Sequence, residues 1–288
     1  PKALWHMNEA TWKIEDASVS VNDGTAINGP ATTAGKLTRA LRFDGADDYA
    51  DMGDPSTVDF GSGDFSIEAW VKLGSLTQAG QEMIVSKDAT PGTAQRQFFL
   101  AVDGLDDNSH KIRFNYNTSD AAQVYADTNA TAISDTNWHH VVGVRSGNSF
   151  LIYVDGVSQA VTSAGTHGTM QATATPLRIG MRPYAALEGY FNCSMDEVAV
   201  WNRALSAAEV SARNNSGAGA ALAGNESGLV SVWHMDDIVT DSSINGNHGL
   251  AQNGADTTAP GILSRAGSFD GTDDYVSVAD NSTLKFGI

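Results

Sequence analysis

The amino-acid sequence predicts an all-β protein, built as a sandwich, a barrel or a jelly roll. The first observation is that short segments alternate between apolar and polar residues, the pattern of a strand with one buried face. In the segment 65–73 the apolar face comprises Phe65, Ile67, Ala69 and Val71. The second observation is that glycine-rich turns separate these segments while helical periodicity is almost absent. Many short strands joined by such turns are typical of those three architectures.

The remaining strand segments follow one another along the chain. Asp-Gly pairs at 103–104 and 155–156 predict tight hairpins, because type I′ turns need positive φ at both central residues. The segments expected to be strands are 65–73, 96–104, 111–117, 138–147, 149–157, 176–181 and 195–202.

One helix is expected, over residues 204–213. Ser206 has the side chain of an N-cap residue, and Glu209 stands where a capping box requires a glutamate. The small and polar segment 216–228 that follows predicts a flexible linker.

An internal repeat sets the domain organisation. Residues 3–9 (ALWHMNE) return within 229–237 (LVSVWHMDD), and residues 41–61 return as 267–287. The period of about 226 residues suits a whole β domain rather than a solenoid unit. We therefore expect a complete domain over 1–215, a linker over 216–228 and the N-terminal part of a second copy over 229–288.

Composition excludes several classes of function. The formal net charge is −17, from 34 acidic and 17 basic residues, which argues against nucleic-acid binding because phosphate neutralisation needs clustered Lys and Arg. No apolar run approaches the ~20 residues that span a bilayer, so membrane insertion is not expected. The single cysteine, Cys193, cannot form an internal disulfide, and burial as a small hydrophobe is the expected role.

The order of motifs resembles a known family. ALRFDGADDYADMG, FSIEAWVKL, WHHVVGVRSG, FLIYVDG, LRIG and MDEVAVWNRALSAAEV occur in this order. This series is similar to the laminin-G-like, concanavalin-A-like domains of microbial surface and secreted proteins. The resemblance covers nearly all of 1–213, and 229–288 look like the first quarter of another copy. It implies a two-sheet antiparallel jelly-roll sandwich with a short C-terminal helix, located outside a bacterial or archaeal cell or on its surface.

The resemblance also implies a structural calcium ion. In the family an N-terminal loop and an acidic pair near the C-terminus supply oxygen ligands, the kind that Ca²⁺ prefers. Val19 and Val21 replace the glycines that usually follow Ser18, which leaves the loop geometry open. The alternative is a loop held by Asx turns without a metal. The implied ligands are Asp16, Ser18, Asn22 and Asp196, with Asp241 and Asn247 as their counterparts in the second copy.

Two other groups of residues resemble metal ligands, but their spacing favours a structural role. The segment 43–49 (FDGADDY) lacks the twelve-residue spacing of an EF-hand, so we expect a turn leading into the next strand. His139 and His140 are adjacent in an expected strand and therefore point to opposite faces, where they cannot chelate one ion together.

An enzyme of the glycosidase or lyase class is the alternative to a binding module. Retaining hydrolysis needs two carboxylates about 5–5.5 Å apart, and Glu68 and Glu197 are the best candidates if their strands are neighbours. The competing interpretation places both at ordinary polar positions on half-exposed strands, and it is the one we favour.

The sequence thus predicts a non-catalytic extracellular module for binding, adhesion or structure. Its expected partners are glycans or cell-surface and matrix proteins. The incomplete second copy also suggests self-assembly, or packing of that copy on the first domain, because its few strands leave edges unpaired. Exposed aromatic residues are the candidate glycan contacts, and the sequence offers Trp12, Tyr125, Tyr184 and Tyr190.

Overall fold

A computed structural model describes most of residues 12–231 and short strands within 232–278. The backbone alone is described for 12–13, 39, 232–233, 238–239, 249–252, 256–261, 264–268 and 275–278. Side chains are described as well for 14, 18, 22–37, 40–77, 80–88, 97–103, 109–182, 190–223 and 225–231. Within these residues no helix has the length and apolar character needed to cross a membrane.

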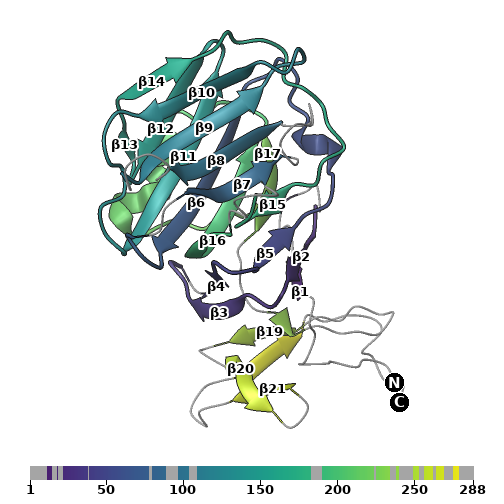
Figure 1. The fold of residues 1–288 in the computed structure, drawn as a ribbon. Coiled ribbons are helices and arrows are strands. Elements are labelled where there is room, and N and C mark those ends of the chain that lie inside the picture. Colours follow the sequence, from purple (N-terminus) through teal and green to yellow (C-terminus); the bar gives the residue numbers. More distant parts are fainter. Residues whose placement is uncertain are drawn as a thin grey trace.

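The described residues form an antiparallel β-sandwich, which confirms the predicted all-β jelly roll (Figure 1). One sheet has nine strands in the order β1 (Trp12–Ile14), β2 (Gly24–Ile27), β5 (Tyr49–Asp51), β15 (Arg178–Ile179), β7 (Gln81–Lys87), β8 (Phe98–Asp103), β9 (Lys111–Asn117), β10 (Gln123–Thr128) and β14 (Val161–Ala164).

The other sheet has eight strands. Their order is β13 (Val157–Ser158), β12 (Ser149–Val154), β11 (Trp138–Ser146), β6 (Phe65–Leu73), β16 (Asn192–Trp201), β4 (Arg39–Asp44) and β3 (Ala31–Ala34), with β17 (Leu229–Trp233) also paired to β16.

The main core lies between the two sheets. The predicted apolar face of β6, formed by Phe65, Ile67, Ala69 and Val71, is completely buried in it. Cys193 is buried there too, as expected of a small hydrophobe.

A second apolar cluster covers the outer face of the eight-stranded sheet beneath α1 (Ala207–Asn214). Ser206 and Glu209 form the predicted capping box at the start of this helix. Val210 of α1 is fully buried and packs in one cluster with Trp201 and Leu205. A single-turn η1 (Ser56–Val58) and η2 (Asn215–Gly217) complete the helical elements of the described chain.

The long strand β16 has two different neighbours on one side. Its first half pairs with β4 through Asn192–Met195, and its second half pairs with β17 through Val198–Trp201. On the other side it pairs with β6, with a bulge between Asp196 and Ala199. β17 belongs to the segment 229–288, which the sequence predicts to be the start of a second copy, so the first strand of that segment pairs with β16.

The described strands of residues 238–278 form two small sheets. One comprises β18 (Ile238–Val239), β19 (Gly249–Gln252) and β22 (Tyr275–Val278), and the other β20 (Asp256–Gly261) and β21 (Ser264–Ser268). Figure 1 shows β19, β20 and β21 below the sandwich, beyond β1 and β3.

Candidate functional site

Two of the residues implied as calcium ligands contact the opening strand of the second copy. The Ser18 hydroxyl donates a 2.7 Å hydrogen bond to the carbonyl oxygen of Val230. The Asn22 amide nitrogen donates to Ser231 Oγ at 2.7 Å and to Thr57 Oγ1 at 2.9 Å. Ser18 and Asn22 are therefore brought together beside β17. Asp16, Asp241 and Asn247 lie outside the described residues.

Asp196 contacts a different part of the module. Its Oδ2 accepts hydrogen bonds from the backbone N–H groups of Lys36 at 2.8 Å and Leu37 at 3.0 Å, between β3 and β4. Asn22 contacts β17 at Ser231, whose register partner on β16 is Val200. Ser18, Asn22 and Asp196 all offer the oxygen atoms that suit Ca²⁺.

The acidic segment 43–49 forms the predicted turn, between β4 and β5. Asp44 Oδ1 accepts from the backbone N–H groups of Ala46 and Asp47, an Asx turn that lowers the pKa of Asp44, Ala46 being the first cause. Burial raises the pKa of Asp48 to about 6. Asp44, Asp47 and Asp48 place carboxylate oxygens within 4.8 Å of one another, and Asp48 Oδ2 also accepts a hydrogen bond from the Asp44 backbone N–H at 3.1 Å.

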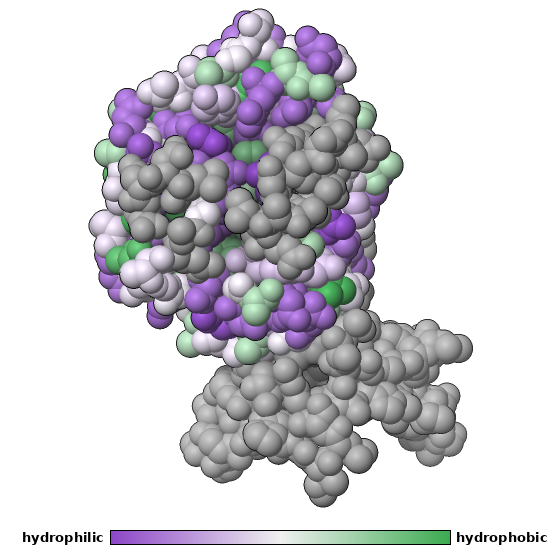
Figure 2. Space-filling model, in the orientation of Figure 1, coloured by the Kyte–Doolittle hydropathy of each residue, from purple (hydrophilic) through white to green (hydrophobic). Residues whose placement is uncertain are grey.

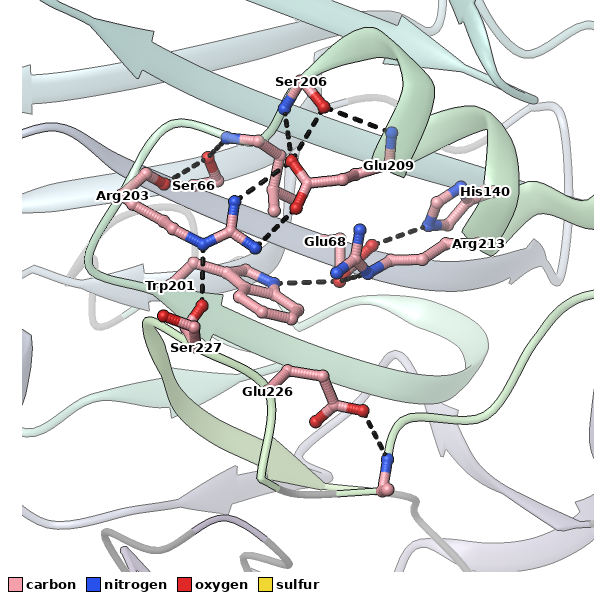
Figure 3. Close-up of polar contacts among 12 residues, drawn as sticks. Ser66, Glu68, His140, Trp201, Arg203, Ser206, Glu209, Arg213, Glu226 and Ser227 are labelled. Atoms are coloured by element: carbon pink, nitrogen blue, oxygen red, sulfur yellow. Dashed lines mark hydrogen bonds and ion pairs between the residues drawn. The ribbon is translucent and has the colours of Figure 1, made fainter.

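Glu68 lies in a closed polar network beneath α1 (Figure 3). Its Oε1 accepts a 2.9 Å hydrogen bond from the indole N–H of Trp201 and forms a 3.1 Å ion pair with Arg213. Its Oε2 lies 3.1 Å from His140 Nε2. The guanidinium of Arg213 also stacks 4.3 Å above the Trp201 ring. One carboxylate thus ties β6, β11, β16 and α1 together.

The half-exposed positions expected for the two candidate carboxylates are not observed. Glu68 is 2% exposed and Glu197 is 8% exposed. The reason is that α1 and Trp201 cover the outer face of β6, which a strand pattern alone does not reveal. The strands of Glu68 and Glu197 are neighbours, as expected, because Ala199 pairs with Glu68. Glu197 itself lies in the β16 bulge, with a φ of 51°.

The four aromatic candidates fall in different places. Trp12 is in β1, paired in register with Ala26. Tyr190 packs near Tyr49, with ring centroids 6.2 Å apart. Tyr184 lies outside the described residues. Tyr125 lies on the outer face of the nine-stranded sheet, because its neighbours in sequence, Val124 and Ala126, are both buried in the core.

Register defines the surroundings of Tyr125 on that outer face. One row across the sheet runs from Phe99 on β8 through Asn115 on β9 to Tyr125 on β10. The next row places Arg113 of β9 beside Asp127 of β10. We call these five residues the Tyr125 cluster. Figure 2 shows hydrophilic residues gathered over the described part of this side of the molecule.

An arginine with two acidic partners organises the cluster. The Arg113 guanidinium donates to both Asp127 oxygens, at 2.6 and 2.7 Å, and lies 3.1 Å from Asp103 Oδ2. The hydrogen bond to Asp127 is the main cause of the raised pKa of Arg113. The same guanidinium stacks 5.0 Å from the ring centre of Tyr125. The side chains of Arg113 and Asp127 are each 22% exposed, so this fixed charge pair remains accessible from solvent.

Asn115 supplies a polar group with spare hydrogen-bonding capacity. Its amide nitrogen donates to the Val124 carbonyl at 3.2 Å, while its buried Oδ1 has no hydrogen-bond partner. Asn115 is only 1% exposed, so this unpaired oxygen is closed to solvent, whereas most buried polar atoms are paired.

A second arginine extends the cluster toward β7. Arg182 donates to Asp88 Oδ2 at 2.7 Å and to Gln81 Oε1 at 2.6 Å, and it lies 5.3 Å from the ring centre of Phe99. Phe99 and Arg182 are buried, so the solvent-facing part of this region is the Arg113–Asp127 pair beside Tyr125.

The sequence suggests Tyr125 as a candidate but not the residues that surround it in the cluster. The signal was present, because Lys111, Arg113, Asn115 and Asn117 are polar at alternate positions of one strand. A polar outer face is also what any solvated sheet shows, so the alternation by itself does not single out a site.

Comparison with known proteins agrees with this architecture. The model of the concanavalin A-like lectin/glucanases superfamily matches residues 44–211. No curated protein sequence is significantly similar to the chain.

Among solved structures, domain 4 of AbnA, an extracellular GH43 arabinanase from Geobacillus stearothermophilus in complex with arabinotriose, has a TM-score of 0.50 at 16% identity. The match covers 71% of this chain and 98% of that one. The binding domain of botulinum neurotoxin serotype G has a TM-score of 0.53 at 12% identity, with coverage of 69% and 47%. The Trypanosoma rangeli sialidase has a TM-score of 0.50 at 20% identity, with coverage of 69% and 30%. Identities this low show a shared fold alone. With a family match over more than half of its length, the chain belongs to the concanavalin A-like lectin/glucanases superfamily.

Proposed function

We propose that this protein is a non-catalytic extracellular carbohydrate-binding module whose Tyr125 cluster contacts the sugar. The observation that carries the proposal is the accessible Arg113–Asp127 pair stacked beside Tyr125. A sugar ring offers an apolar face for the tyrosine and hydroxyls that both donate and accept hydrogen bonds.

The fixed charges suit a neutral ligand. Arg113 is already neutralised by Asp127 and Asp103, and Arg182 by Asp88. Each of these charges therefore has a partner when the site is empty. A ligand hydroxyl needs only to form hydrogen bonds with groups that are already paired. We therefore assign neutral oligosaccharides as the ligand class. The extracellular location of the AbnA relative, which was solved with arabinotriose, supports the same proposal.

The experiment is a glycan array probed with the purified chain, followed by calorimetric titration of the sugars it selects. Tyr125→Ala should weaken binding about tenfold or more, corresponding to the ~1.4 kcal/mol of one lost stacking contact. The control is Leu151→Ala, which removes an exposed apolar side chain on the outer face of β12. Unchanged affinity in Tyr125→Ala, with the control equally unaffected, would place the sugar elsewhere.

The enzymatic alternative requires Glu68 or Glu197 to act on a glycosidic bond. The engagement of Glu68 by Trp201, His140 and Arg213 supports a structural role for it. Turnover of an array sugar by the wild-type chain that disappears in both Glu68→Gln and Glu197→Gln would establish catalysis and overturn the non-catalytic proposal.

Calcium forms part of the proposal as a stabilising ion. Ser18, Asn22 and Asp196 offer only oxygen donors, and the family resemblance points to the same set. A bound ion would stabilise the fold by mass action, since it binds the folded state alone. Thermal unfolding should occur at a higher temperature in calcium than in a chelator, and Asp196→Asn should reduce that difference. Equal melting temperatures in both buffers would show that calcium does not stabilise the fold.

A further inference from the structure

The second half of β16 needs a strand beside it. Val198, Ala199, Val200 and Trp201 are all completely buried. On one side they pair with β6, and on the other β4 has already ended opposite Met195. Without a further strand the backbone groups on that side would lose their partners inside the protein, a costly arrangement.

The opening strand of the second copy fills this place closely. Val230 enters the main core at 3% exposure, and Leu229 joins the cluster of Trp201 beneath α1. Ser231 is fully buried and accepts the hydrogen bond from Asn22. Both faces of β17 are thus complementary to the first domain, and the strand pairs with β16 from Val198 to Trp201, with a bulge between Val200 and Trp201.

The chain carries a second version of this strand that fits the place less well. Aligning Trp5 with Trp233 sets Lys2 against Val230 and Pro1 against Leu229. A lysine in the core position would bury a charge, and a proline cannot donate a backbone hydrogen bond. The strand that belongs to the following repeat is therefore the better occupant.

We propose that this β16 edge is a strand-acceptor site for a second copy of the chain, which supplies its own Leu229–Trp233. The segment from 218 to 228 connects β17 to the rest of the first domain, so the strand can leave with its connector while the sandwich remains. When two chains exchange this strand, every contact of β17 forms again in the partner. The only unfavourable free energy is then the entropy lost when two chains associate. Two chains joined in this way form a closed dimer.

Cysteine pairing in the full-length chain tests the exchange. In a Cys193→Ser background, Ala199→Cys and Val232→Cys place thiols on register partners, whose Cα separation suits a disulfide. A chain with both substitutions should form an internal disulfide. A mixture of two chains with one substitution each should form a disulfide-linked heterodimer after partial unfolding and refolding at high concentration.

Two matched controls separate exchange from chance oxidation. Ser158→Cys, exposed on β13 at the other end of the sheet, replaces the acceptor thiol. The heterodimer yield with Ala199→Cys should exceed that with Ser158→Cys at least tenfold. Adding Val230→Lys to the donor chain should lower the yield by a similar factor, because the core rejects the charge.

Two outcomes overturn the proposal. If the doubly substituted chain closes internally while the mixture gives no more heterodimer than the Ser158→Cys control, β17 stays in its own chain. If the doubly substituted chain forms neither kind of disulfide, β17 does not occupy the β16 edge at all.

Discussion

The indole N–H of Trp201 donates a 2.9 Å hydrogen bond to Glu68 Oε1, joining β16 to β6 beneath the only α-helix of the described chain. Arg213 of that helix pairs with the same oxygen. The C-terminal motif of the domain is therefore fastened to its central strand by one buried carboxylate, and this arrangement predicts how the fold responds to substitution.

Glu68→Gln should destabilise the protein by about 3 kcal/mol, because the amide leaves Arg213 without its buried counter-charge. Unfolding in urea is monitored by tryptophan fluorescence, and the denaturation midpoints of the variants are compared at equal m-value. Asp47→Asn, an exposed carboxylate in the turn after β4, is the control and should change stability by less than about 0.5 kcal/mol. Equal midpoints for the two variants would contradict the structural role of Glu68.

Glu82 should make the protein less stable as pH rises. Burial raises the pKa of this carboxyl from 4.5 to about 8, and its Oε1 has no hydrogen-bond partner. The folded protein therefore keeps a proton that the unfolded chain releases, so the contribution is complete below pH ~4.5 and is lost progressively toward pH 8, at up to about 1.4 kcal/mol per pH unit. Glu82→Gln should flatten this decline in urea midpoints measured between pH 5 and 8. A decline as steep as in the wild type would show that other groups cause it.

His139 should contribute stability in the charged form. Hydrogen bonds to Asp155 at 2.8 Å and to Asp135 at 3.1 Å raise its pKa, with Asp155 as the first cause. The contribution is therefore complete below the unfolded pKa near 6.5 and disappears as pH rises through the folded value. Titration of the imidazole by NMR should give a higher pKa in the wild type than in Asp155→Asn. The same value in both proteins would contradict the ion pair.

The capping box of α1 should be worth about 1 kcal/mol. Ser206→Ala removes the acceptor for the Glu209 backbone N–H, a loss typical of N-cap serines. Ser158→Ala on the exposed strand β13 is the matched control. Hydrogen bonding from Arg203 is the main cause that lowers the pKa of Glu209 to about 2, so the box stays charged down to that pH. Calorimetric melting that cannot tell the two variants apart would show that α1 is held by packing alone.

Much of the fold was readable from local patterns. The alternation over 65–73, the turn at 43–49 and the Ser206–Glu209 box each depend on neighbours within a few residues. The structure confirms all three.

Relationships between distant segments were not readable in the same way. The polar pattern around Glu68 suggested partial exposure, because nothing local states that α1 covers that face. The pairing of β17 with β16 joins two repeats, and a strand pattern does not name its partner. Tyr125 was identified as a single aromatic, but the row with Asn115 and Phe99 depends on a register that only the assembled sheet provides.

Chemical-shift mapping of the sugar selected by the glycan array tests the central claim most directly. The amide and side-chain signals of the isotopically labelled chain would be followed during titration. The account predicts that the largest shifts fall on Tyr125, Arg113, Asn115 and Asp127, and that Glu68 and His140 beneath α1 stay unchanged. Shifts centred on Glu68 and Glu197, with none on the outer face of the nine-stranded sheet, would contradict it.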